Sequence, residues 1–330
     1  MVKLNFNKMP DVVLQNISKS YGTVEAVKDV SFSVNKGEIF GLIGPDGAGK
    51  TTIFRLLTTL LLPNAGDAYV NGLDVQKDFK QIRSFVGYMP GRFSLYQDLS
   101  VEENLNFFAT LFNTTVEENY DLIKDIYVQL EPFKTRKAGN LSGGMKQKLA
   151  LCCALIHRPK VLFLDEPTTG VDVVSRKEFW EMLKRLKKQG ITILVSTPYM
   201  DEAVMCDRIA LIQNGEIMSI ETPQKIIDDY ADKLYAIRSE NMSKLLKDLR
   251  TIDVVKSCNS FGEFHHITLR QPNQEVDKSN GKSAEYIQIE KLIESLGQMN
   301  HMNVEINEIE PTIEDCFIDL MGHKNNMEQQ

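Results

Sequence analysis

A glycine-rich segment with a single lysine carries the clearest chemistry in this chain. It reads GPDGAGKTT, fits the pattern G-x-x-x-x-G-K-[ST], follows an apolar stretch and precedes a helical pattern, which is the context such a loop requires. Its three glycines let successive N–H groups turn toward an anion, and the start of the following helix adds positive charge. Lys50 can reach the β- and γ-phosphates of a nucleotide, and the Thr51 hydroxyl can ligate Mg²⁺. The candidate phosphate-binding residues are Gly44, Pro45, Asp46, Gly47, Ala48, Gly49, Lys50, Thr51 and Thr52.

Two adjacent acids, Asp165 and Glu166, stand at the end of the apolar run VLFLD. An acid at the end of a buried strand can hold a metal-bound water, and a second one can orient an attacking water. Taken alone, the pair can also be interpreted, less favourably, as a strand that ends in two surface acids. The phosphate loop makes the catalytic interpretation the better one, with Asp165 as a second Mg²⁺ contact and Glu166 as the catalytic carboxylate.

A third motif, LSGGMKQ, opens a helical pattern that runs through ALCCALIHRP. A serine followed by two glycines at a helix start offers free N–H groups to an anion. The candidate residues are Ser142, Gly143 and Gly144, and without the other motifs an ordinary helix N-cap is the more common explanation.

Short apolar runs alternate with helical patterns between Val12 and Tyr235 and must position these motifs. Near-continuous runs of Val, Ile, Leu and Phe are typical of parallel strands covered on both faces, and two earlier alternating stretches predict antiparallel strands. Ser/Thr-x-x-Glu capping boxes predict helix starts at Ser100, Thr115 and Ser175. The expected parallel strands are residues 37–44, 86–89, 161–165, 191–196 and 208–215.

The pattern divides the chain into three parts. Residues 1–11 form an N-terminal extension, residues 12–235 an α/β nucleotide-binding domain with an antiparallel β subdomain, and residues 236–330 a small α+β domain. A helical insertion over about residues 100–158 separates sheet strands that must meet again in space.

Composition excludes several classes of protein. The chain has 330 residues with 38 Lys and Arg against 45 Asp and Glu, and this net charge of −7 argues against a protein that coats nucleic acid. No apolar run approaches the ~18 residues that cross a bilayer, and the first residues lack the apolar core of a secretory signal. Five cysteines without a CxxC pair fit reduced thiols. We therefore expect a cytoplasmic chain.

The three motifs occur in an order that resembles the nucleotide-binding subunit of an ATP-binding cassette (ABC) transporter, a P-loop NTPase. GPDGAGKTT matches the Walker A loop, LSGGMKQ the signature, and VLFLDEPTTGVD the Walker B strand. The resemblance covers roughly residues 12–235, about two thirds of the chain. It implies that two such domains dimerise head to tail with ATP and Mg²⁺ between them, and that hydrolysis drives membrane-spanning permease chains.

The same resemblance assigns further residues. Ser142, Gly143 and Gly144 would contact the γ-phosphate across the dimer, Asp172 would link the two sites, and Tyr21 would stack on adenine. Alone, Tyr21 is more often a surface aromatic. The ending IEPTIEDCFIDLM resembles the accessory segment of bacterial ATPases paired with export-type permeases. Together with the cassette motifs, this ending indicates a multidrug-type exporter at the inner face of the cell membrane.

Two positions depart from the family pattern. The family places a glutamine after its YMP strand and a histidine after its VST strand, whereas this chain has Gly91 and Pro198. Neither residue can contact a γ-phosphate through a polar side-chain group, so we expect ATP binding with slow hydrolysis at the chain's own loop. The favoured assembly is a heterodimer with a second ATPase that keeps both residues, with a homodimer as the alternative. A non-hydrolytic regulatory subunit that completes a partner's site is the alternative function.

Overall fold

The computed structural model describes residues 9–270 and 284–327 of the chain, which divides into two compact units. The first comprises residues 1–226 with 320–330, and the second comprises residues 227–319. The domain boundary expected after Tyr235 falls inside strand β11 (Leu234–Arg238), which pairs with other strands of the second unit. The second unit therefore begins earlier than the sequence pattern suggested.

A six-stranded sheet forms the centre of the first unit, in the order β10-β9-β3-β8-β7-β6. All neighbouring pairs are parallel except β10 with β9. Every residue of β3, β7 and β8 is buried, which explains their continuous apolar sequences. The expected parallel strands are confirmed. Their bounds are β3 Ile39–Ile43, β6 Val86–Met89, β7 Val161–Asp165, β8 Thr192–Thr197 and β9 Arg208–Gln213. The antiparallel edge strand β10, Glu216–Glu221, was not predicted.

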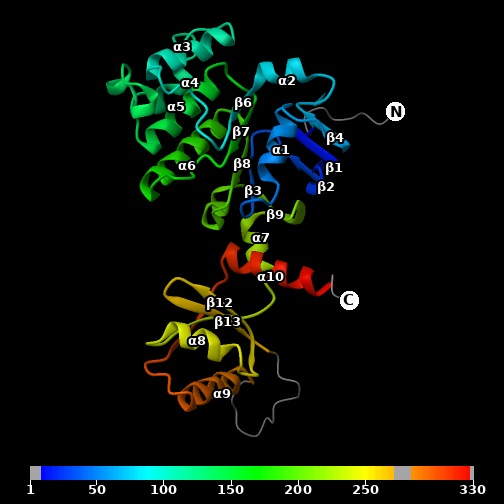
Figure 1. The fold of residues 1–330 in the computed structure, drawn as a ribbon, viewed down its shortest axis with the longest axis vertical. Coiled ribbons are helices and arrows are strands. Elements are labelled where there is room, and N and C mark those ends of the chain that lie inside the picture. Colours follow the sequence, from blue (N-terminus) through cyan, green and yellow to red (C-terminus); the bar gives the residue numbers. More distant parts are fainter. Residues whose placement is uncertain (1–8, 271–283, 328–330) are drawn as a thin grey trace. The chain divides into compact units, whose positions relative to one another are not determined.

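A four-stranded antiparallel sheet, in the order β2-β1-β4-β5, provides the second layer. Within the first unit, the parallel sheet lies between this sheet and a group of helices (Figure 1). One core joins the layers: Phe32 of β2 stacks on Phe40 of β3 at 5.2 Å, and Phe54 of helix α1 meets Phe163 of β7 edge-on. The bounds are β1 Val12–Tyr21, β2 Val24–Val34, β4 Ala65–Val70, β5 Leu73–Asp74 and α1 Lys50–Leu57.

Of the extension expected over residues 1–11, residues 1–8 lie outside the described part of the chain. Asp11 already belongs to the core: its backbone N–H donates to the Val34 carbonyl, and its buried carboxylate accepts from the Thr192 hydroxyl at 2.5 Å. The ordered cassette therefore begins slightly before Val12.

Three helices make up the expected helical insertion: α3 (Val101–Leu111), α4 (Tyr120–Tyr127) and α5 (Gly143–Leu155). The capping box of Ser100 with Glu103 is present at the start of α3. Thr115 and Glu118 also exchange hydrogen bonds, but they close a turn before α4 and do not begin it.

The third predicted capping box is wrong. Helix α6 (Val173–Lys188) begins two residues before Ser175, because the Asp172 carboxylate accepts from the Ser175 N–H at 3.0 Å and is the N-cap. Aspartate competes well with serine at this position. The remaining short elements of the first unit are α2 Phe79–Phe85, η2 Glu131–Phe133, η3 Ala138–Asn140, η4 Met200–Met205 and α7 Pro223–Asp228.

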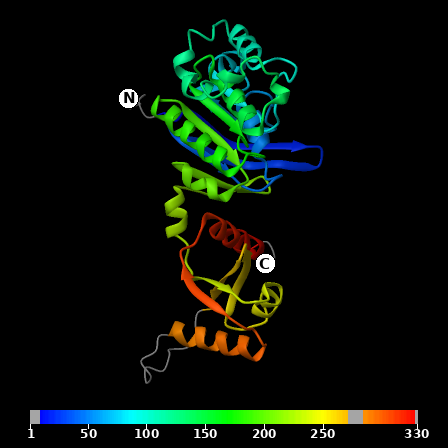
Figure 2. The same cartoon turned by 90° about the vertical axis from the view of Figure 1, so that its left-hand side faces the viewer.

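The second unit follows a β-α-β-β-α-β order with an antiparallel sheet arranged β12-β13-β11-β14. This is the split βαβ arrangement of ferredoxin-like domains and an α+β fold, as expected. Leucines of α8 and α9 pack on one face of the sheet, and Figure 2 shows α9 beside the strands. The bounds are α8 Met242–Leu249, β12 Val255–Phe261, β13 Phe264–Leu269, α9 Ala284–Gln298, β14 Glu305–Ile309 and the following helix α10 Ile313–Met327.

Within residues 9–270 and 284–327, no helix combines the length and apolar composition that a membrane span requires.

Candidate functional site

The predicted phosphate loop connects β3 to α1 and is shaped by close backbone contacts. A Cβ at Gly44 would lie 2.1 Å from the Ile212 carbonyl oxygen, so no larger residue fits there. Gly49 is the N-cap of α1 with a φ of 102°, a conformation that glycine adopts without steric cost. The loop therefore ends at the N-terminus of α1, whose unpaired N–H groups favour an anion.

Lys50 is held beneath this loop. Its side chain is only 3% exposed, and its ammonium donates to the carbonyl oxygens of Gly44 at 2.7 Å and Pro45 at 2.9 Å. The same ammonium lies 3.2 Å from a carboxylate oxygen of Glu166. The fold thus joins the lysine of one motif to the predicted catalytic acid of another, more than a hundred residues away.

Ser196 of β8, which the sequence analysis did not single out, fixes both acids. Its hydroxyl donates to the Asp165 carboxylate at 2.7 Å, and the Glu166 N–H donates to the Ser196 carbonyl oxygen and hydroxyl. Glu166 has a φ of 51°, a strained conformation for a residue with a side chain. Burial, followed by the charge of Asp165, raises the pKa of Tyr88 on β6 to about 12, so this hydroxyl stays protonated beside the acids.

The oxygen donors of the site suit a magnesium ion. Asp165 is 2% exposed at the end of β7, and Thr51 supplies a hydroxyl from the first turn of α1. Among the described residues, no three acidic, histidine or cysteine side chains gather into a metal-binding group. Mg²⁺ commonly binds through one or two protein oxygens, substrate phosphates and water, so this donor set fits the ion without a complete protein cage.

Gly91 lies against the acid pair. A Cβ built there would approach the Asp165 carbonyl oxygen to 3.1 Å and the Glu166 Cβ to 3.7 Å. A side chain at this position would therefore project beside the predicted catalytic carboxylate, where glycine supplies no polar group.

Pro198 follows β8 in a segment held by the buried carboxylate of Glu202. This carboxylate accepts from the Thr197 hydroxyl at 2.6 Å, the Thr168 hydroxyl at 3.0 Å and the Arg176 guanidinium at 3.0 Å. These contacts fix the backbone on both sides of the strand end. Proline at this point offers neither a polar side-chain group nor an N–H.

The residues expected to act across a dimer form a second cluster. Ser142 is the N-cap of α5, and a Cβ at Gly144 would lie 3.0 Å from the Ser175 hydroxyl beside the Asp172 cap. Among the described residues, no hydrogen bond or ion pair joins Ser142, Gly143, Gly144 or Asp172 to the phosphate loop. Within the described chain, these residues therefore make no direct polar contact with Lys50 or the phosphate loop.

Tyr21 ends β1 with 44% of its surface exposed. The Lys19 ammonium lies 5.9 Å from its ring centre. A flat ring is thus available at the edge of the antiparallel sheet, and no interaction with the phosphate loop is formed within the described chain.

A groove of about 740 Å³ between the parallel sheet and the helical insertion was not predicted. Its lining includes Leu60 and Leu111, which are 55% and 60% exposed, and the ring of His157. His157 stacks on Phe112 and donates from Nε2 to the Val86 carbonyl oxygen, while its buried Nδ1 has no partner in the described chain. Burial lowers the pKa of His157, so the ring is neutral near pH 7. In the sequence, the spacing of apolar residues over α3 is the one signal that could have indicated this surface.

A glycine-rich loop between a buried strand and a helix, with paired acids at the end of a parallel strand two places away in the same sheet, defines a P-loop nucleotide-binding protein. The family described as ABC transporter matches residues 27–169. The chain is 31% identical over 315 residues to the linearmycin resistance ATP-binding protein LnrL of Bacillus subtilis, covering 93% of this chain and 97% of the relative. This chain belongs to the ABC transporter family.

A second relative is the probable multidrug ABC transporter ATP-binding protein YbhF of Escherichia coli, 37% identical over 94% of this chain. The match covers 52% of YbhF, so the chain spans about half the length of this relative. The solved dimeric structure of the ATP-binding cassette MJ0796, in a post-hydrolysis state bound to ADP and Pi, is similar to this chain with a TM-score of 0.59 and 26% identity. It covers 64% of this chain and 98% of the cassette.

Proposed function

We propose that this chain is the ATP-binding subunit of a bacterial exporter that couples ATP binding and hydrolysis to transport through separate permease chains. The observation that carries the proposal is the junction of Lys50, the loop carbonyls and Glu166 in one buried cluster. The relatives named as multidrug and linearmycin resistance ATP-binding proteins support the export direction.

ATP binding rests on the phosphate-loop side of the site. Lys50 and the N–H groups of α1 would hold the phosphates, while Thr51 and Asp165 would contact Mg²⁺ directly or through its water shell. Bound Mg²⁺ would neutralise charge on the phosphates. Glu166, beside the loop, is placed to accept a proton from an attacking water.

Slow hydrolysis is the second part of the proposal. Gly91 places no polar group beside Glu166, and Pro198 places none at the end of β8. Loss of one preorganised donor to a transition state costs about 2.7–4 kcal/mol, roughly 10²–10³ in rate. ATP affinity is expected to survive, because Lys50 and the loop backbone are unaffected.

Dimerisation would complete the site. Ser142, Gly143, Gly144 and Asp172 lie in a cluster apart from the chain's own loop, as residues that serve a partner's site would. We favour a second ATPase as this partner. Its own site would keep the glutamine and the histidine and would be completed by the signature segment of this chain, so the heterodimer would have one good site and one slow site. A homodimer would contain two slow sites.

The groove beside α3 is the proposed docking site for the permease. It is open and largely apolar, and it displays the exposed side chains of Leu60 and Leu111. This contact would place the chain at the inner face of the membrane. Leu60→Asp with Leu111→Asp should reduce its recovery with membranes that contain the permease, whereas Val128→Asp, at a similarly exposed valine that caps the C-terminus of α4, should not.

The decisive experiment compares steady-state ATP turnover of the purified chain with that of its Glu166→Gln variant, with ATP binding measured in parallel. Slow turnover that disappears in the variant supports a weak but working ATPase. Normal turnover would contradict the slow site, and failure to bind ATP would overturn the proposal.

The second candidate function is a non-hydrolytic regulatory subunit, favoured specifically by Gly91 and Pro198. It predicts the same background turnover in both proteins, with ATP bound in each. Turnover should then appear only after a partner ATPase is added.

A further inference from the structure

Strand β8 lies between the strand that leads into the phosphate loop and the strand that ends in the two acids. The sheet order β3-β8-β7 places it there, and the register sets Ser196 opposite Leu42 on one side and Asp165 on the other. The backbone of β8 also contacts the loop, since the Gly44 N–H donates to the Thr197 carbonyl oxygen at 3.3 Å. The end of β8 therefore contacts both halves of the candidate site.

The hydroxyl of Ser196 joins the two acids. It donates to the Asp165 carboxylate at 2.7 Å and accepts from the Glu166 N–H at 3.0 Å, so its one donor and one of its acceptor positions are both used. Within the described chain, Ser196 is the one side chain that is hydrogen-bonded to both acids. Because Ser196 is fully buried and Asp165 is 2% exposed, loss of this hydroxyl would leave a buried carboxylate oxygen without its donor.

The same residue supports an uncommon backbone conformation. Glu166 has a φ of 51°, which glycine adopts without cost and glutamate does not. Its N–H is shared between the Ser196 hydroxyl at 3.0 Å and the Ser196 carbonyl oxygen at 3.1 Å, and the Thr169 N–H closes the turn by donating to the Glu166 carbonyl at 3.2 Å. From this turn the Glu166 carboxylate lies 3.2 Å from the Lys50 ammonium.

We propose that Ser196 is a positioning residue of the nucleotide site. Its hydroxyl orients the Asp165 carboxylate toward Mg²⁺ and holds Glu166 in the left-handed turn that presents the carboxylate beside Lys50. The inference rests on the proposed function, because the two acids have these roles only in a chain that binds ATP with Mg²⁺. Partners that orient a metal contact commonly account for about 10–100-fold in metal affinity.

This role separates two contributions of the β8 end. Ser196 holds the acids, whereas Pro198, two residues later, supplies no polar group to the site. The loss at position 198 leaves the contacts of Ser196 in place. The chain should therefore keep Mg²⁺-dependent ATP binding although its hydrolysis is slow.

The first test measures binding of a fluorescent ATP analogue to the full chain in Mg²⁺ and in EDTA. The readout is the ratio of the Kd in EDTA to the Kd in Mg²⁺, named here the Mg²⁺ ratio, which separates the contribution of the metal from that of Lys50 and the loop. Ser196→Ala should lower the Mg²⁺ ratio by about tenfold or more and leave the Kd in EDTA unchanged. Ser196→Cys, which keeps the shape of the side chain with a weaker donor, should lower the ratio by less.

Thr197→Val is the matched control. Thr197 is also fully buried on β8, but its hydroxyl donates to Glu202 at 2.6 Å and, within the described chain, forms no hydrogen bond with either acid. The substitution keeps the backbone carbonyl that accepts from Gly44. It should lower the urea midpoint and leave the Mg²⁺ ratio at the wild-type value. A similar fall of the ratio in Thr197→Val and Ser196→Ala would overturn the proposal, since any buried hydroxyl of β8 would then have the same effect.

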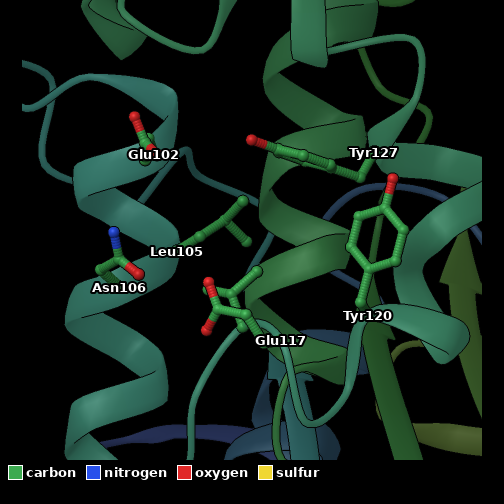
Figure 3. A pocket seen from close by; sticks show the side chains of 7 residues that line it. Glu102, Leu105, Asn106, Glu117, Tyr120 and Tyr127 are labelled. Carbon is green, nitrogen blue, oxygen red and sulfur yellow. The ribbon is translucent and has the colours of Figure 1, made fainter.

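The second test needs no nucleotide and concerns the left-handed turn. Ser196→Ala should lower the urea midpoint less in a Glu166→Gly background than in the wild type, because glycine needs no support at this φ. Equal shifts would show that Ser196 does not hold the turn. Glu117→Gln is the control background: Glu117 is an exposed carboxylate in the helical insertion, at the hollow between α3 and α4 shown in Figure 3. In that background Ser196→Ala should shift the midpoint as it does in the wild type.

Failure of the inference and failure of the proposed function give different results. If the wild type binds ATP and Ser196→Ala keeps the wild-type Mg²⁺ ratio, the inference is overturned and the proposed function stands. A wild-type ratio near one would also overturn the inference, since no metal contact would need positioning. If the wild type binds ATP neither in Mg²⁺ nor in EDTA, the proposed function fails and the inference falls with it.

Discussion

The two sides of the nucleotide site differ in how much of their chemistry is kept. On one side, Gly44–Thr52 forms a complete phosphate loop with Lys50 buried beneath it. On the other side, Gly91 and Pro198 occupy positions beside Glu166 and at the end of β8 without a polar side chain. In the proposed function, phosphate binding and water positioning would be carried by separate segments, so one could be lost while the other stays intact.

The segments around Glu166 and Pro198 are also held by hydrogen bonds, although polar side chains are absent at Gly91 and Pro198. Glu202 accepts three hydrogen bonds around the β8 end, and Ser196 holds both acids in place. The framework that would present a histidine or glutamine is preserved. The difference between the two sides is thus one of side-chain chemistry, which makes it reversible by substitution.

The largest expected effect comes from restoring the missing groups. Gly91→Gln with Pro198→His should raise ATP turnover by roughly 10²–10³, with each single change giving less because such groups act together. The 3.1 Å approach of a Cβ to the Asp165 carbonyl requires a small shift of the loop. Single-turnover hydrolysis of bound ATP measures the gain, and Gly91→Ala controls for the added Cβ. If the double variant still binds ATP but its turnover does not rise, the missing glutamine and histidine are not the cause of slow turnover.

Breaking the Glu202 network should cost stability without costing ATP affinity. Glu202→Ala leaves the mostly buried Arg176 charge paired only with the exposed Asp201 and removes the acceptor of the Thr168 and Thr197 hydroxyls, and we expect the free energy of unfolding to fall by about 3 kcal/mol. Asp201→Ala removes the other acid paired with Arg176, but Asp201 is 75% exposed and its loss should matter far less. Urea denaturation measures both. Similar destabilisation by the two variants would argue against a framework centred on Glu202.

In contrast to Glu202→Ala, Lys50→Ala should lower ATP affinity more than it lowers stability. Loss of the charged hydrogen bonds to phosphate should weaken ATP binding by about thirtyfold, while the urea midpoint changes less than in Glu202→Ala. Lys36→Ala, at an exposed lysine outside the loop, is the control for the charge change. Equilibrium binding of a fluorescent ATP analogue provides the measurement, and unchanged affinity would contradict the assignment of the phosphate side.

The smallest expected effect is on the pH dependence of stability and concerns Asp172, one of the residues that would serve a partner's site. The N–H of Ser175 lowers the pKa of the Asp172 carboxyl below its usual value of 3.8. Its stabilisation of α6 is thus fully present above 3.8 and is lost as the pH falls through the lower folded value. Asp172→Asn keeps a good N-cap that does not titrate, so the wild type should lose slightly more stability in acid than this variant. If the free energies of unfolding of the wild type and of Asp172→Asn fall at the same rate with decreasing pH, the Asp172 charge does not stabilise α6.

Much of the fold followed from local patterns. Continuous apolar runs predicted the buried strands β3, β6, β7, β8 and β9, because a strand covered on both faces leaves little room for polar residues. The start of α6 was misjudged because Ser175 and Glu178 satisfy the capping pattern while Asp172 occupies the position that is used. The helix start predicted at Thr115 was wrong for a similar reason, because the reciprocal hydrogen bonds of Thr115 and Glu118 close a turn before α4.

The residues of the candidate site also divide into those that a local motif predicted and those that only the fold revealed. Lys50, Asp165 and Glu166 were predicted because each lies in a motif with a fixed spacing. Ser196 and Glu202 were not, since a serine in an apolar strand and a glutamate in a short helix have no distinctive spacing. Their roles depend on which strands become neighbours: the parallel register places Ser196 opposite Asp165.

The sequence by itself determined the local chemistry of this protein: the phosphate loop, the paired acids, the signature segment and the absence of polar groups at Gly91 and Pro198. Spacing along the chain suffices for these, because each motif acts through its own backbone or adjacent side chains. Only the tertiary structure decided that Lys50 meets Glu166 and that Ser196 and Glu202 form hydrogen bonds around the candidate site. Those contacts join residues distant in sequence, and they exist only once strands and helices have packed.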